Sequence, residues 1–238
     1  MIRRPLAVVI ALTLAAGVVA SSGVAQAKKK PPSAPKFQVS VLPIDVTKDP
    51  WAWVSPTDWP ARAYPPVHVF GHTYLDGKTE ATLTISMVKV GTPVIAAYSG
   101  VVTRILSQPE TCDAEVYVDL RKGGTLHGSY DHITPSVKVG QKVVAGQVIG
   151  SVPAWQCNQP YGGMELMVIE NTSSDTKARC PLSIVDPKNK ALLDGQIRGV
   201  MEKWNTYVGD ATSSGGSSAY TADDLARGIC ETTYAPAN

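Results

Sequence analysis

The four histidines of this chain lie close together in the sequence, as His68, His72, His127 and His132. Imidazole titrates near neutral pH and is the most common neutral metal ligand in proteins. Histidines that are close in sequence but spread over several strands are what a metal site or an acid–base site requires. For His68 and His127 the alternative is a structural role, in packing or on the surface.

The cysteine pattern indicates disulfides rather than a metal site. Cys112, Cys157, Cys180 and Cys230 are even in number, and no two of them have CxxC spacing. Four cysteines allow three pairings. We favour Cys112 with Cys157 and Cys180 with Cys230, because each pair then stays within one block of similar composition. Disulfides also predict an oxidising compartment.

The elements that must position the histidines are β-strands. Across residues 67–175, runs rich in Val, Ile and Thr alternate with glycine-containing turn signals. The runs cover 81–90, 94–106, 115–120 and 143–152. Strands that recur after such short intervals predict a mostly β domain, an antiparallel β-sandwich or open barrel.

Segments of different composition flank this predicted β domain. Residues 37–66 are rich in proline and tryptophan, which forbids long helices and favours an extended arm wrapped over the next domain. We interpret the tryptophans as packing anchors, with a sugar-stacking platform as the alternative. Residues 176–238 are expected to form a C-terminal helical appendage, because apolar residues recur at helical intervals over 189–208. A second, short helix is predicted from an N-cap at Thr221.

The chain begins with a basic leader. Residues 1–27 have the pattern of a secretory signal peptide, with Arg3 and Arg4 before an apolar run and a small-x-small cleavage site ending at Ala27. The run is about 15 residues long, shorter than the roughly 20 that span a bilayer, so a membrane anchor is the weaker alternative. Residues 28–36 are interpreted as a Lys/Pro tether, either a solvated linker or a basic arm held on an anionic envelope. We expect a secreted, periplasmic or envelope protein with no transmembrane span after cleavage.

The net charge of +2 arises from this leader. Six of the 22 Lys and Arg precede Phe37, whereas none of the 20 Asp and Glu does, so the body carries 16 basic and 20 acidic residues and a charge of −4. A nucleic-acid binder would concentrate Lys and Arg on a folded face, so this class is excluded. The hydrophobic content of 44% excludes a chain that is disordered throughout.

Four motifs, in this order, resemble the lysostaphin/LytM-type zinc metallopeptidases of the bacterial cell wall. They are His72-Thr-Tyr-Leu-Asp76, the glycine-containing segment 91–102, Tyr130-Asp-His132-Ile, and the segment 139–150. The resemblance extends to about Glu170 and implies the LytM-like fold, the duplicated hybrid motif. The family places the second motif soon after the first, whereas here residues 77–90 intervene and are expected to form an added hairpin.

The resemblance also implies site residues. In this family an HxxxD motif supplies two zinc ligands, and a later HxH motif supplies a third ligand and a catalytic histidine. His72 and Asp76 are thereby implied as metal ligands, and His132 as a catalytic histidine that stabilises the tetrahedral intermediate. Structural alternatives stay open, because Asp76-Gly77 is a favoured hairpin turn and His132 could be a cross-strand hydrogen bonder.

The HxH motif itself is missing from this chain, which reads Gly163-Met164-Glu165 at the corresponding place. Glu165 is the implied third ligand, with an ordinary strand residue as the alternative, and no side chain replaces the base. A catalytic zinc requires three protein ligands and a water whose pKa it lowers to about 7. One histidine with two carboxylates is a harder and less zinc-selective ligand set.

Two functional hypotheses follow. The first is a secreted or envelope-associated LytM-like protein, a degenerate member without catalysis, that binds peptidoglycan or regulates cell-wall enzymes. The second is an active zinc metalloendopeptidase that cleaves cell-wall peptides with a His/Asp/Glu metal set. Zinc is the cofactor of the second hypothesis, and peptidoglycan or a cell-wall protein is the expected partner in both.

Overall fold

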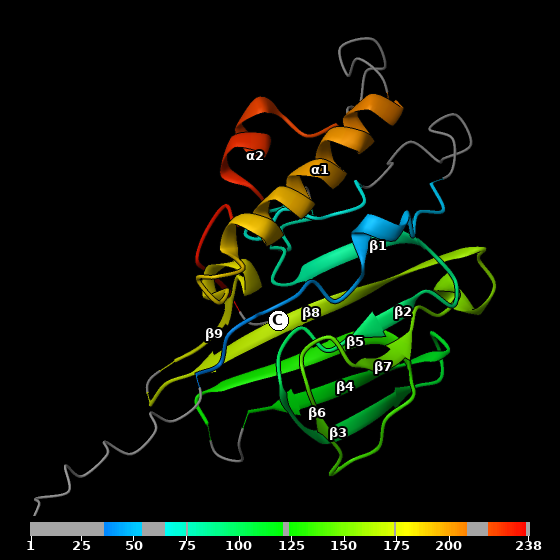
Figure 1. Cartoon of the computed structure of the whole chain (residues 1–238), viewed down its shortest axis with the longest axis vertical. Helices are drawn as coiled ribbons and strands as arrows, with labels where there is room; N and C mark the ends of the chain where they lie inside the picture. Colours follow the sequence, from blue (N-terminus) through cyan, green and yellow to red (C-terminus); the bar gives the residue numbers. More distant parts are fainter. Residues whose placement is uncertain are drawn as a thin grey trace, which may run out of the picture. The chain divides into compact units, whose positions relative to one another are not determined.

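The central element of the computed structural model is an antiparallel β-sheet (Figure 1). The structure describes residues 36–53, 65–74, 76–120, 124–173, 175–208 and 219–236. Its strands are β1 (Leu83–Lys89), β2 (Pro93–Ile95), β3 (Gly100–Gln108), β4 (Asp113–Asp119), β5 (Leu126–Pro135), β6 (Lys142–Val143), β7 (Val148–Ser151), β8 (Tyr161–Asn171), β9 (Thr176–Arg179) and β10 (Tyr234–Pro236). The predicted signal peptide, most of the tether and part of the Pro/Trp-rich arm lie outside the described residues.

The sheet is open rather than closed into a barrel. Its main path runs β10-β9-β8-β5-β4-β3-β6, while β1 pairs with β8 and β2 pairs with β7, which in turn pairs with β5. Strand β8 is the longest, and one of its edges is shared by β1 and β9. The prediction of a mostly β, antiparallel, LytM-like fold is therefore confirmed. The boundaries of the five predicted segments stay a prediction.

The two faces of β8 show why this sequence forms a strand. Met164, Leu166 and Val168 are buried in the core, whereas Glu165 and Met167 between them are only half-buried. Side chains that alternate in this way place one face on the core and the other toward solvent. Strand β1 is buried in the same core, so residues 83–89 belong to the sheet and not to the added hairpin expected from the sequence.

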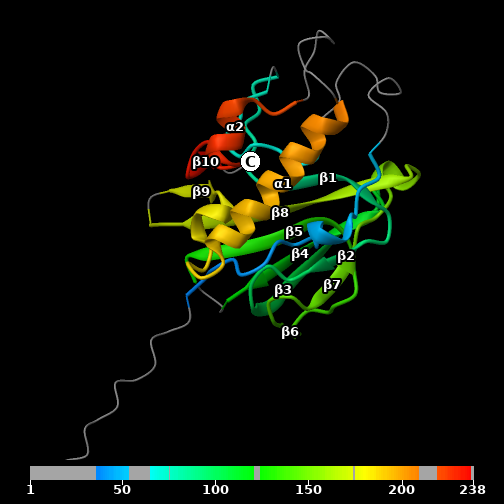
Figure 2. The ribbon, with the colours of Figure 1, turned by 45° about the horizontal axis from the view of Figure 1, so that its top comes forward.

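The C-terminal segment supplies the helices, as predicted. Helix α1 (Lys190–Val208) buries Leu193, Ile197, Val200, Met201 and Trp204, spaced three and four residues apart. Helix α2 (Ala222–Arg227) begins at a capping box in which Thr221 and Asp224 each accept a hydrogen bond from the other's backbone N–H. Figures 1 and 2 both place α1 beside β1 and beside the 3-10 helix η1 (Val46–Lys48) of the arm.

The arm and the C-terminal segment are fastened to the sheet. Trp51 bridges to Val88 of β1, and Trp53 contacts the rings of Trp51 and Trp204, which confirms packing as the role of these two arm tryptophans. A 3-10 helix, η4 (Pro181–Ile184), connects β9 to α1. Both predicted disulfides are present, Cys112–Cys157 and Cys180–Cys230. No helix among the described residues is long and apolar enough to cross a membrane.

Candidate functional site

The solvent-facing side of β8 and its two neighbours carries the polar residues of the candidate site. Glu165 on β8 lies opposite Thr84 of β1 and opposite Asp131 of β5. Directly opposed residues on antiparallel strands have Cβ atoms about 5 Å apart. Within the part of the chain that the structure describes, the carboxyl group of Glu165 makes no hydrogen bond and no ion pair. Of the two carboxylates among these opposed residues, Asp131 accepts from His132 N, and Glu165 is the one whose side chain has no hydrogen-bonding partner.

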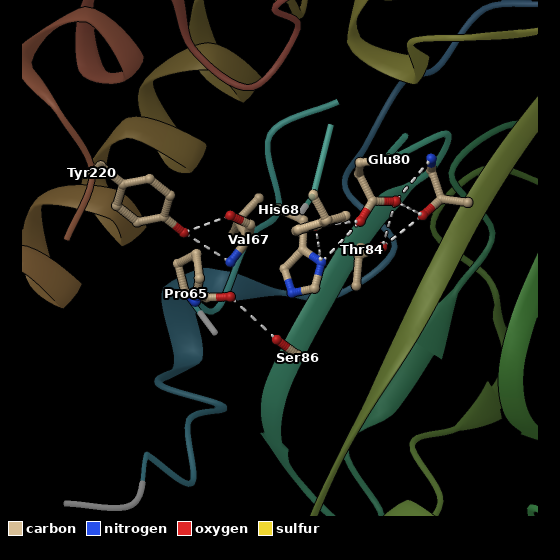
Figure 3. A network of polar contacts seen from close by, with 9 residues as sticks. Pro65, Val67, His68, Glu80, Thr84, Ser86 and Tyr220 are labelled. Carbon is tan, nitrogen blue, oxygen red and sulfur yellow. Dashed lines mark hydrogen bonds and ion pairs between the residues drawn. The ribbon is translucent and has the colours of Figure 1, made fainter. Parts of the chain in front are cut away.

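A dense polar network surrounds Glu80, just before β1 (Figure 3). His68 Nδ1 lies 2.9 Å from Glu80 Oε2, and the Tyr74 hydroxyl donates to the same oxygen at 3.0 Å. The other oxygen, Oε1, accepts from the Thr82 hydroxyl at 2.7 Å and from the Thr84 hydroxyl at 3.3 Å. The carboxylate of Glu80 is therefore buried with both oxygens occupied.

The network depends on a segment that runs alongside β1. The backbone N–H of His68 donates to the carbonyl of Thr84, and the Ser86 hydroxyl donates to the carbonyl of Pro65. From the C-terminal segment, the hydroxyl of Tyr220 accepts from Val67 N at 2.9 Å and donates to Val67 O at 2.6 Å, as Figure 3 shows. These bonds fix the segment 65–68 and thereby the imidazole of His68.

The pKa values of Glu80 and Glu165 are shifted in opposite directions. Burial alone would raise the pKa of Glu80, but the hydrogen bond and charge of His68, with the hydroxyls of Thr82 and Tyr74, lower it to about 2. Burial raises the pKa of Glu165, and the nearby charge of Glu80 raises it further, against the opposing effect of His132. Of two neighbouring carboxyl groups, one is firmly ionised and the other is shifted toward holding its proton.

His132 is presented by an irregularity in β5. The pairing of β4 and β5 shifts register between Ala114 and Val116, and His132 has a left-handed backbone with φ of 54°. Bulges of this kind redirect a side chain out of the regular alternation. The redirected imidazole places Nδ1 2.8 Å from Oδ2 of Asp113, whose side chain is almost fully buried.

The surroundings of His132 favour its protonated form. Burial lowers the pKa of His132, but the charge of Asp131, the hydrogen bond to Asp113 and the charge of Glu165 together raise it above its ordinary value. The ring also contacts Trp155 edge to face, with centroids 5.6 Å apart. The imidazole of His132 is thus held by Asp113 and shifted toward its protonated form, and the charge of Glu165 contributes to that shift.

His72 and Asp76 lie on the segment between His68 and Glu80. The carbonyl of His72 accepts a hydrogen bond from Glu80 N at 2.8 Å, and its ring contacts that of Tyr74. Both His72 and Asp76 are exposed, and Asp76 accepts a hydrogen bond from Lys78 N at 3.1 Å beside Gly77, whose φ is 83°. This is the Asp-Gly turn that the sequence offered as the alternative to a metal-ligand role for Asp76. The charged groups that act most strongly on Glu165 are Glu80, His132, Asp131 and His68, and neither His72 nor Asp76 is among them.

His68 and His127 both have structural partners. His68 belongs to the Glu80 network described above. His127 Nδ1 lies 3.1 Å from Oδ1 of Asp119, and the other oxygen of Asp119 accepts from the Thr103 hydroxyl at 3.0 Å. The structural interpretation of these two histidines is therefore consistent with their contacts.

Gly163, which stands where the family has a histidine, has little room for a side chain. A Cβ atom at this position would lie 2.9 Å from the carbonyl oxygen of Ile85 and 3.1 Å from the Cα of Ser86. Any larger residue would require the backbones of β1 and β8 to separate. The position that would carry the missing base is thus closed by the strand pairing itself.

The described residues do not assemble the zinc site that the resemblance implies. Among them, no group of three or more His, Cys, Asp or Glu side chains is arranged so that it could hold a metal ion. The carboxylate whose charge acts most strongly on Glu165, that of Glu80, already has both oxygens bonded to protein donors. Zinc binding and the metal-ligand roles of His72, Asp76 and Glu165 stay predictions, as does the catalytic role of His132.

Sequence reasoning found Glu165 and His132 but missed three residues beside them: Glu80, Asp113 and Trp155. One signal was available, because Glu80 and Thr84 have the same four-residue spacing as His72 and Asp76. Asp113 and Trp155 are brought to His132 by strand register and by a disulfide, and neither is visible in residue spacing.

Comparison with known proteins points to one family. The sequence model of Peptidase family M23 matches residues 81–172, a segment that includes His132 and Glu165 but begins after His72 and Asp76. No curated protein matches the chain significantly.

Several solved structures are similar to this chain. Lysostaphin, the antimicrobial peptidase of Staphylococcus simulans, is 19% identical over 58% of this chain and 56% of its own, with a TM-score of 0.40. The catalytic domain of the prophage-encoded M23 protein EnpA from Enterococcus faecalis is 21% identical over 50% and 94%, with a TM-score of 0.38. A zinc-containing peptidase from Vibrio cholerae is 16% identical over 56% and 36%, with a TM-score of 0.38. The chain therefore spans little more than half the length of lysostaphin.

The family match covers the strands that carry the candidate site, from β1 to β8. Those strands form the open antiparallel sheet that the sequence resemblance predicted. Residues 81–172 of this chain, the segment that carries the candidate site, are thus similar to peptidase family M23.

Proposed function

We propose that this protein uses the M23 fold to bind peptidoglycan, or a protein of the cell wall, without hydrolysing it. The observation that carries the proposal is the state of Glu80. Its two oxygens are occupied by His68, Tyr74, Thr82 and Thr84, so it is not available to join Glu165 in holding a metal ion. A metallopeptidase needs three protein ligands and a metal-bound water.

The absence of a base at Gly163 supports the same proposal. Hydrolysis needs a group that takes a proton from the attacking water, within hydrogen-bond reach of it. A side chain at this position would meet the carbonyl of Ile85. The shift of His132 toward its protonated form also makes it a weaker candidate for the missing base.

The remaining parts of the proposal concern place and partner. The protein is exported by its signal peptide and acts in the cell envelope, where its two disulfides are stable. The solvent-facing side of β8, β5 and β4 contacts the cell-wall polymer. The Lys-rich tether adds attraction to the anionic envelope.

Co-sedimentation of the mature chain, residues 28–238, with purified peptidoglycan sacculi tests this function. Soluble products released from the sacculi and the zinc content of the protein are measured on the same sample. Binding without released peptide and without stoichiometric zinc is expected. The variant Glu165→Gln should change neither the zinc content nor the amount of released peptide, because in this proposal Glu165 holds no metal.

Two outcomes would contradict the proposal. Release of cell-wall peptides by a protein that carries one zinc per chain, and loss of both in Glu165→Gln, would establish the active metalloendopeptidase instead. A lack of binding to sacculi would remove peptidoglycan as the partner.

A further inference from the structure

One corner of the site has an unusual concentration of backbone strain. Six non-glycine residues among those described have positive φ, and four of them lie here: Cys112, His132, Gln156 and Cys157. Non-glycine residues in the left-handed region cost about 1 to 3 kcal/mol each and persist where the surroundings enforce them, which is often at binding sites. A strained cluster of this kind motivates a search for a functional side chain that it positions.

Trp155 is the side chain that this corner positions. It opens the 3-10 helix η3 (Trp155–Cys157), and 43% of its surface is exposed. The Cys112–Cys157 disulfide joins η3 to the turn before β4, where Asp113 holds His132. We call Trp155, His132, Asp113 and this disulfide the Trp155 corner.

The geometry of the Trp155 corner combines an apolar surface with a polar group. The indole contacts the ring of His132 at an interplanar angle of 65°. Nδ1 of His132 is bonded to Asp113, so Nε2 is the ring nitrogen left to form a hydrogen bond with a ligand. An exposed indole beside a ring nitrogen held in place by Asp113 suits a ligand that has one apolar face and hydroxyl groups at its edge, because a hydroxyl can both donate and accept a hydrogen bond.

We propose that the Trp155 corner is a subsite for a neutral sugar ring of the peptidoglycan glycan strand. A pyranose has C–H groups on its face, which stack on the indole, and hydroxyls on its rim, one of which forms a hydrogen bond with His132 Nε2. The proposal rests on the peptidoglycan binding proposed above and names the part of the polymer that is recognised.

Glycan strands freed of their peptides are the probe that tests this subsite. Binding of the mature chain is measured by calorimetry for the wild type and for Trp155→Ala and Trp155→Phe. Trp155→Ala should bind at least about tenfold more weakly, as expected of a contact dominated by one aromatic side chain. Trp155→Phe should retain most of the affinity. Tyr234→Ala is the matched control, because Tyr234 is an equally exposed aromatic residue on the distant strand β10, and it should bind as the wild type does.

The positioning role of the disulfide is tested by a double-mutant cycle. Cys112→Ser with Cys157→Ser should weaken binding about as much as Trp155→Ala, and the combination of all three changes should weaken it no further. Additive losses would show that the disulfide does not act through Trp155. Thermal unfolding of each variant, monitored by circular dichroism, confirms that the protein is folded.

The outcomes separate this inference from the proposed function. If the wild type binds intact sacculi but not peptide-free strands, or if Trp155→Ala binds the strands as the wild type does, the sugar subsite is wrong and peptidoglycan binding stands. If Tyr234→Ala loses as much affinity as Trp155→Ala, the contact is not confined to the corner and the inference fails. If the wild type binds neither material, both proposals fail.

Discussion

The pKa values of two carboxyl groups beside Thr84, those of Glu80 and Glu165, are shifted in opposite directions. Glu80 is surrounded by hydroxyl and imidazole donors, which stabilise its charged form more than burial destabilises it. Glu165 has no such donors and a second carboxylate nearby, so burial dominates. At the scale of single residues, the number of donors that reach a carboxylate decides its charge, and burial alone does not.

Glu80→Gln should destabilise the fold at neutral pH but not in strong acid. The folded-state pKa of Glu80, about 2, lies below the ordinary value of 4.5, so its stabilising contribution is present above about pH 4.5 and is lost as the pH falls through about 2. The variant should lose about 2 kcal/mol of unfolding free energy at pH 7, since bonds to a charged group are replaced. Urea unfolding at pH 7 and pH 2.5 measures the loss at each pH. Glu110→Gln, on an exposed turn, is the control that should change neither value. An equal loss at both pH values would contradict the prediction.

Asp113→Asn should lower the pKa of His132. Because the folded-state pKa of His132 is raised, protonated His132 contributes stability that is fully present below about pH 6.5 and is lost as the pH rises through the folded pKa. Removal of the Asp113 charge weakens that contribution. Histidine resonances followed by NMR against pH report the change. Asp119→Asn, which removes the carboxylate beside His127, should leave the titration of His132 as it is. An unchanged His132 in Asp113→Asn would show that Asp131 and Glu165 alone determine its pKa.

At the scale of elements, the sequence predicted some parts of the fold better than others. The strands that carry His132 and Glu165 were predicted least well. Helix α1 and the positions of β1, β3 and β4 follow from periodicity and from runs of Val, Ile and Thr. Strands β5 and β8 had no such runs and were not predicted individually. The reason is physical, because their half-buried positions carry His, Asp and Glu, and these residues weaken the strand pattern.

Glycines in the same two strands weaken the pattern further. A Cβ at Gly128 would lie 1.9 Å from the hydroxyl oxygen of Tyr98, and one at Gly162 would lie 1.9 Å from the carbonyl oxygen of Pro153. Close approach therefore requires glycine where strand propensity would favour a β-branched residue. The partners of His132 and Glu165 depend on register and on a bulge, which residue spacing does not encode. The strands that matter most for function were thus the hardest to predict.

Gly163→Ala should weaken the pairing of β1 with β8. Its Cβ would lie 2.9 Å from the carbonyl oxygen of Ile85, so the two backbones must separate, at a cost of about 1 to 3 kcal/mol. Gly195→Ala in α1 is the matched control. No atom lies within 4 Å of a Cβ at Gly195, so the gain in helix propensity should stabilise the protein by about 0.5 to 1 kcal/mol. Chemical denaturation of both variants gives the two free energies. If both variants change the free energy of unfolding in the same direction, β1 and β8 separate at little cost and the prediction is wrong.

At the scale of the whole molecule, the C-terminal segment returns to the sheet at several places. Strand β10 pairs with β9, Phe70 bridges to Cys230, and Tyr220 binds both backbone groups of Val67. These contacts join residues more than 50 positions apart and lie on the side of the fold that carries the Glu80 network. The C-terminal appendage therefore fixes the segment that holds His68 in place.

Tyr220→Phe should destabilise the whole fold by about 3 kcal/mol. The change leaves the buried N–H and C=O of Val67 without the hydroxyl that satisfies both, and each unsatisfied group costs about 1 to 3 kcal/mol. Tyr207→Phe, which removes an exposed hydroxyl 3.4 Å from the carbonyl of Trp53, should cost less than about 1 kcal/mol. The midpoints of urea unfolding compare the two variants. A small effect of Tyr220→Phe would indicate that water replaces the hydroxyl.

The order of the two disulfides along the chain bears on how the protein matures. Each cysteine pairs with the next one in sequence, across 45 residues for the first pair and 50 for the second, so the two covalent loops neither overlap nor enclose one another. In a chain that emerges N-terminus first into an oxidising compartment, Cys112 meets Cys157 before Cys180 and Cys230 are exposed. If the proposed export takes place, we expect the first pairing that oxidation produces to be the native one, so that maturation needs an oxidant but no isomerase to exchange mispaired cysteines.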